Sequence, residues 1–134
     1  MTSTVEFFIP GLPVPFARAG GGKNTPRFTP TKQRNAMAAI KDYGALAMAG
    51  RPPFDQALRL RVVVVYPWPS SWSARVRERN GIWKTTKPDA DNLLKLIKDA
   101  LEPVIWVNDA RIVVVEALKR YGEIAGVHIR VEAI

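Results

Sequence analysis

The sequence predicts an α/β fold, more narrowly of the α+β type, in which a small mixed β-sheet is flanked by helices. Three observations predict it. The chain has 134 residues, a length that suits one hydrophobic core. Four segments show the apolar alternation of strands, and three others show helical spacing. No repeat or linker divides the chain, so we expect residues 1–134 to form a single domain.

Alternation of apolar residues marks the expected strands, which cover residues 5–9, 58–66, 112–118 and 126–131. The first strand ends at Pro10, because proline cannot donate to a sheet. The segment 58–66 alternates at first and then becomes apolar on both faces. This change favours a central position in the sheet.

Helical spacing marks the expected helices, which cover residues 31–48, 73–80 and 92–102. The second helix is short, with Ser73 as its N-cap. The third has the clearest apolar face and ends near Pro103. Segment 11–30 is rich in proline, glycine and basic residues, which predicts a long basic loop.

Composition excludes several kinds of protein. A net charge of +8 indicates a polyanionic partner. The chain has no cysteine, which excludes disulfides and thiolate zinc sites, and His128 is its one histidine. No apolar run is long enough to span a membrane, and the first residues do not resemble a signal peptide. We therefore expect a cytoplasmic protein without a membrane partner.

Carboxylates gather where the third helix begins. Asp89 and Asp91 are two residues apart, and side chains with this spacing point the same way in an extended segment. Two carboxylates on one face suit a hard cation such as Mg²⁺. Lys95 and Asp99 follow Asp91 at intervals of four, so one side of the helix carries all three.

A simpler interpretation is that Asp91 caps the helix and Lys95 is its ion-pair partner. Asp-x-Asp also occurs in sugar transferases and phosphatases. The presence of a third carboxylate, Asp109, favours a metal site over this simpler interpretation. The third helix leads the chain roughly 15 Å away, and residues 103–109 can span at most ~25 Å, so Asp109 has the reach to return. Three carboxylates near a lysine are typical of phosphodiester cleavage.

Two runs of sequence carry a resemblance to a known family. Residues 87–101 are Lys-Pro-Asp-Ala-Asp-Asn-Leu-Leu-Lys-Leu-Ile-Lys-Asp-Ala-Leu, and residues 106–112 are Trp-Val-Asn-Asp-Ala-Arg-Ile. In these runs the chain resembles the RusA family of Holliday-junction resolvases, endonucleases common in bacteria and their prophages. The resemblance implies a small homodimer that binds four-way DNA junctions. It also implies paired cuts with Mg²⁺, or Mn²⁺ in its place, in recombination and repair.

The resemblance also assigns site residues by position. The family's catalytic and metal-binding aspartates fall on Asp89, Asp91 and Asp109, and its essential lysine falls on Lys95. The family usually has two adjacent aspartates where this chain has Asn108 and Asp109. Because the second of the pair is the ligand, we expect the site to survive with altered surroundings.

Two groups of basic residues indicate a surface for DNA phosphates. The expected DNA-binding residues are Arg18, Lys23, Arg27, Arg75, Arg77, Arg79, Lys84 and Lys87. Among the four tryptophans we single out Trp72 for stacking on bases that open at a junction, although tryptophan is more often a core residue.

Two other functions stay open at this point. A junction-binding protein without cleavage would keep the basic residues and tolerate Asn108. A nucleotide-sugar transferase would use Asp89 and Asp91, but 134 residues leave little room for its sugar-nucleotide domain. We expect a homodimer because two cuts in a two-fold symmetric substrate need two sites. The apolar residues 105–107 offer an interface, although they could equally fill the core of one chain.

Overall fold

The computed structural model describes residues 3–14 and 31–134. Its strands are β1 (Thr4–Pro10), β2 (Leu58–Tyr66), β3 (Ile112–Tyr121) and β4 (Gly126–Ala133). Its helices are α1 (Thr31–Met48), α2 (Ala74–Asn80) and α3 (Ala90–Leu101), followed by the 3₁₀ helix η1 (Asp109–Arg111). Each predicted strand and helix is confirmed. The predicted bounds of β1, β3, β4 and α3 were wrong: the three strands run further, and α3 begins two residues and ends one residue earlier.

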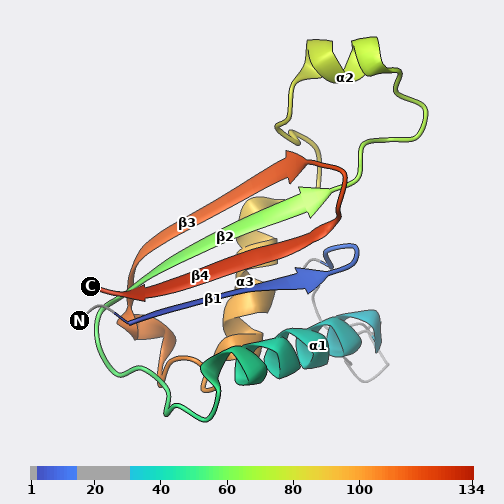
Figure 1. The fold of residues 1–134 in the computed structure, drawn as a ribbon. Helices are drawn as coiled ribbons and strands as arrows, with labels where there is room; N and C mark the ends of the chain where they lie inside the picture. Colours follow the sequence, from blue (N-terminus) through green and yellow to red (C-terminus); the bar gives the residue numbers. More distant parts are fainter. Residues whose placement is uncertain (1–2, 15–30) are drawn as a thin grey trace, which may run out of the picture.

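The strands form a mixed sheet in the order β1-β4-β2-β3. β2 is parallel to β3, and β4 is antiparallel to both β1 and β2. The predicted central position of β2 is therefore confirmed, and the fold is a small α+β domain. Figure 1 shows α1 and α3 on one face of the sheet, with α2 standing apart on the excursion that follows β2.

The core lies between this sheet and helices α1 and α3. Alternate side chains of β2 from Leu58 to Val64 are at most 1% exposed and face the helices. α3 contributes Leu93, Leu96, Ile97 and Leu101. Ile105 and Trp106, which the sequence offered for an interface or a core, are fully buried in the core.

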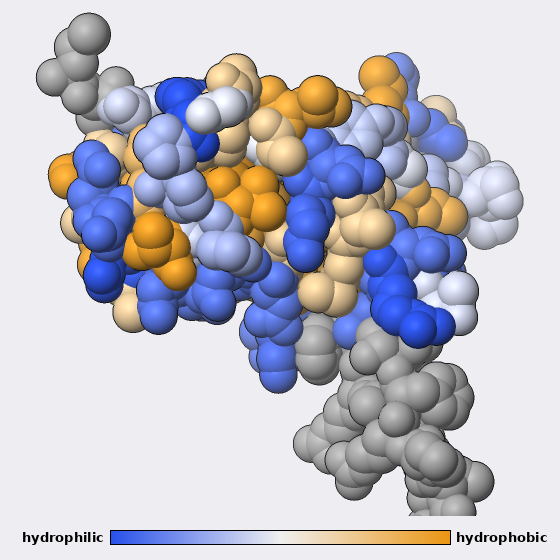
Figure 2. Space-filling model, turned by 90° about the horizontal axis from the view of Figure 1, so that it is seen from below, coloured by the Kyte–Doolittle hydropathy of each residue, from blue (hydrophilic) through white to orange (hydrophobic). Residues whose placement is uncertain are grey.

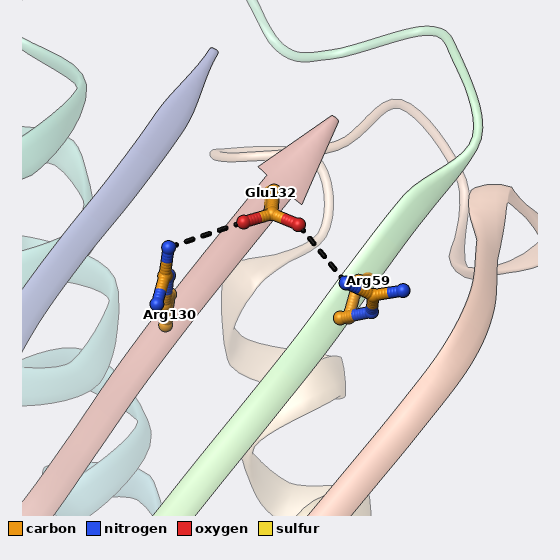
Figure 3. Close-up of polar contacts among 3 residues, drawn as sticks. All are labelled: Arg59, Arg130 and Glu132. Carbon is orange, nitrogen blue, oxygen red and sulfur yellow. Dashed lines mark hydrogen bonds and ion pairs between the residues drawn. The ribbon is translucent and has the colours of Figure 1, made fainter. Parts of the chain in front are cut away.

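The opposite face of the sheet carries charged residues. Arg59 of β2 and Arg130 of β4 each lie 3.1 Å from a different carboxylate oxygen of Glu132 (Figure 3). Such exposed ion pairs contribute little to stability. His128 is also exposed.

The molecule seen from below, on the side where α1 lies, is a mosaic of hydrophilic and apolar patches (Figure 2). Leu46 of α1 is the most exposed large apolar residue among those described, at 78%. Across residues 3–14 and 31–134, no helix combines the length and apolar character needed to cross a membrane.

Adjacent positions on β2 test this arrangement of the sheet. Leu60→Ala should lower the free energy of unfolding by about 2–5 kcal/mol, because it leaves a cavity between sheet and helices. Arg61→Ala, one residue along on the exposed face, should cost less than about 1 kcal/mol. Urea denaturation of both variants checks the difference, and equal losses would contradict the assignment of faces.

Candidate active site

Asp89 and Asp91 lie at the start of α3. Asp89 is the N-cap, with an extended backbone (φ −72°, ψ 145°), and its side chain makes no capping hydrogen bond. Asp91 lies in the first helical turn. The sequence interpretation had placed both residues on an extended segment, and it was wrong for Asp91 because the helix begins at Ala90. Both carboxylates are exposed and come from the same helix end.

Lys119 of β3 holds the segment that leads to these carboxylates. Its Nζ donates hydrogen bonds to the backbone oxygens of Thr86 and Pro88, each at 2.7 Å. Hydrogen bonds from a charged donor are about twice as strong as neutral ones. The ammonium therefore fixes the backbone directly before Asp89.

The same segment also pairs with β3 through its backbone. Lys84 donates its N–H to the oxygen of Lys119 at 3.1 Å, and Tyr121 donates to the oxygen of Ile82 at 2.7 Å. Sequence reasoning missed Lys119. The available signal was a lysine in register with the buried Val64, at a position where an apolar side chain is expected.

Lys95 lies four residues after Asp91 and is exposed on α3. Residues with this spacing share one side of a helix, so the structure is compatible with the prediction that the Asp91 carboxylate and the Lys95 ammonium are neighbours. Asp99 continues the same side one turn further on.

Asp109 lies at the other end of α3. Its Oδ1 accepts a hydrogen bond from Trp106 Nε1 at 2.7 Å, and its backbone N–H donates to Glu102 Oε2 at 2.7 Å. Glu102 directly follows α3, whose twelve residues span about 18 Å. The predicted return of Asp109 to the other two aspartates therefore does not occur within one chain, because buried Trp106 and Glu102 hold it where the helix ends.

The described part of the chain accordingly contains no group of three carboxylate, histidine or cysteine side chains able to hold a metal ion. Asn108, where the family usually has an aspartate, accepts a hydrogen bond from the N–H of Ala110 at 2.8 Å and caps η1. An aspartate would serve equally well as this cap.

The basic residues of α2 are exposed but do not share one side of the helix. Arg75 and Arg79 are one turn apart, whereas Arg77 lies over the ring of Trp68 with its guanidinium carbon 5.0 Å from the ring centroid. Lys87 is exposed two residues before Asp89. Arg18, Lys23 and Arg27 lie outside the described residues, as does most of the predicted basic loop.

Lys84, in the segment that leads to Asp89, contacts a cluster of aromatic residues. Its Nζ is 5.0 Å from the ring centroid of Tyr66 and 5.7 Å from that of Tyr121, and it donates to Thr86 Oγ1 at 2.7 Å. Tyr121 also contacts Trp72 edge to face, with 5.3 Å between centroids. Burial raises the pKa of Tyr66 to about 12, so its phenol stays neutral at physiological pH.

A substitution at Lys119 tests its role in positioning the segment. Lys119→Met keeps the aliphatic stem but leaves two backbone oxygens without their donor, at a cost of about 1–3 kcal/mol. Amide hydrogen exchange over residues 84–91 should become faster. Lys41→Met, on the exposed side of α1, is the matched control and should leave exchange there unchanged. Unaltered exchange in the Lys119 variant would contradict the role.

Two comparisons with known proteins identify relatives of this chain. The family model described as endodeoxyribonuclease RusA matches residues 10–132, which include every described candidate residue. The uncharacterized protein YqaN of Bacillus subtilis (strain 168) is 30% identical over 142 aligned residues, covering 97% of this chain and 96% of the relative. The extent of the family match settles the classification: the chain belongs to the RusA endodeoxyribonuclease family.

Proposed function

We propose that this protein is a Mg²⁺-dependent endonuclease that resolves four-way DNA junctions. The observation that carries the proposal is the pair of exposed carboxylates, Asp89 and Asp91, on a rigidly held helix start beside Lys84 and Lys87. Membership of an endodeoxyribonuclease family supports hydrolysis of DNA rather than sugar transfer.

The carboxylate pair fits a hard cation. Mg²⁺ is usually held by one or two protein carboxylates, with waters and substrate phosphates completing its coordination. Asp89 does not use its carboxylate to cap α3, so both of its oxygens remain available to a ligand. Mg²⁺, or Mn²⁺ in its place, supplies an activated water and neutralises charge on the reacting phosphate.

The chain's own residues bind and orient the DNA in this proposal. Lys95 contacts the reacting phosphate, because it shares the helix side of Asp91. Lys119 is a positioning residue, since it acts on the backbone before Asp89. Phosphates away from the cut are bound by Arg18, Lys23, Arg27, Arg75, Arg77, Arg79, Lys84 and Lys87.

We also infer a homodimer in which the third carboxylate of each site comes from the second chain. β3 is an edge strand, and Val113, Val114 and Val115 are 60%, 40% and 49% exposed on it. An exposed apolar edge readily pairs with another strand. The segment 82–84 already pairs with the last residues of β3, so the free part of the edge is the exposed stretch before them. Two β3 strands pairing antiparallel along this stretch about a two-fold axis bring the start of each toward the end of the other.

This pairing brings the separated carboxylates together. β3 begins just after Asp109, and its last residues include Lys119, which holds the segment before Asp89. Asp109 of one chain then lies near Asp89 and Asp91 of its partner. Two equivalent sites related by a two-fold axis match the symmetry of a four-way junction.

Cleavage of a synthetic four-way junction, beside a linear duplex of the same sequence, tests the activity. Wild-type protein with Mg²⁺ should cut the junction and spare the duplex. Asp89→Asn, Asp91→Asn and Asp109→Asn should each slow cleavage on the order of 100-fold or more, with junction binding retained. Asp99→Asn, further along α3, is the control and should cut normally. Junction binding without cleavage by wild-type protein would establish the non-cleaving alternative.

Mixing two inactive variants tests the shared site. A dimer of one Asp89→Asn chain and one Asp109→Asn chain has one intact site if the carboxylates come from different chains. In an equal mixture about half of the dimers contain both variants, and each of these has one intact site out of two. The mixture should therefore nick junctions with roughly a quarter of the wild-type number of active sites. A mixture of Asp89→Asn and Asp91→Asn chains is the control, since every site in it is damaged. Equal inactivity of both mixtures would overturn the shared site.

A further inference from the structure

We propose that a cavity beside the carboxylate pair binds one unstacked nucleobase of the DNA substrate. The cavity is a depression widely open to solvent, with a volume of about 650 Å³. Its lining includes Tyr66, Trp68, Trp72, Lys84, Thr86 and Tyr121. The inference deepens the proposed function. It rests on that function in one respect only, namely that the DNA substrate is a junction.

The cavity is built from aromatic rings. Tyr66 and Tyr121 are buried, whereas Trp68 and Trp72 are half-buried. Trp68 is stacked against Tyr121 at 6.4 Å between ring centroids, and Trp72 meets the same ring edge to face. Rings held in place this way bind bases at low entropic cost, because stacking needs little further ordering of the protein.

The charges around the cavity select a nucleotide. Lys84 lies 5.0 Å from the Tyr66 ring centroid, and Arg77 lies 5.0 Å from the Trp68 ring centroid. Because cations already occupy these ring faces, a cationic ligand such as a methylated lysine is repelled. A neutral base on an anionic backbone is attracted by the same two groups.

Two polar atoms of the lining await a partner. Tyr66 Oη and Trp68 Nε1 are buried and have no hydrogen-bond partner among the described residues. Buried polar atoms in folded proteins nearly always have one, so these two atoms are exceptions. Because both atoms have almost no accessible surface, they reach an acceptor on the base only if their rings move when it binds.

The cavity lies close to the carboxylates along the chain. Thr86 lines it, and Asp89 follows three residues later on the backbone that Lys119 holds. Three extended residues span about 10 Å, so a base in the cavity lies within a few nucleotides of the phosphate at Asp89. Extruding a base costs least where pairing is already weak, as at the branch point of a junction.

Binding to single strands tests the cavity without any need for a junction or a metal. The two probes are a fifteen-nucleotide oligothymidylate and an abasic strand of equal length and charge, both in EDTA. Wild-type protein should bind oligothymidylate at least about fivefold more tightly, as expected for stacking of one base. Trp72→Leu should abolish the preference, whereas Trp72→Phe, which keeps an aromatic face, should retain most of it.

Trp83→Leu is the matched control, because Trp83 is 54% exposed and does not line the cavity. It should leave the preference intact. Equal affinity of wild-type protein for both strands would overturn the inference, and so would a preference that survives Trp72→Leu or disappears in Trp83→Leu. If the protein cuts junctions but shows no preference for oligothymidylate, only the base site is disproved. If it shows the preference but does not cut junctions, only the proposed activity is disproved.

Discussion

The ammonium of Lys119 is the contact on which the candidate site depends. It joins the end of β3 to the backbone oxygens of Thr86 and Pro88, and so holds a segment that would otherwise be a loop between α2 and α3. The carboxylates at the start of α3 and the aromatic cavity lie on the two sides of this attachment. A single charged group on the sheet therefore sets the position of the two carboxylates relative to the aromatic cavity.

The sequence predicted the fold well where the pattern of apolar residues follows burial. β2 and α3 are examples, since each carries an uninterrupted buried face. It failed at the end of β3, where Lys119 and Arg120 interrupt the apolar pattern although Ile82 and Lys84 continue the pairing. It also failed for Asp109, because chain length gives only the greatest distance a segment can cover, whereas the hydrogen bonds to Trp106 and Glu102 fix where it stops.

Positive charge is paired within the protein on one part of the surface and unpaired on another. On the outer face of the sheet, Arg59 and Arg130 share Glu132, so much of their charge is neutralised within the protein. At the end near α2, the exposed cations Arg75 and Arg79 have no carboxylate partner among the described residues. The charges of these two arginines therefore remain available to a polyanion.

The isolation of α2 has a consequence for how this protein can change. None of its seven residues is buried, and Ser73 caps it from the loop before it. Substitutions on α2 therefore alter little of the core, and the scaffold tolerates them at small cost in stability. The helix can vary in sequence while β3 and α3 stay fixed, so its exposed arginines can change without moving the carboxylate pair at the start of α3.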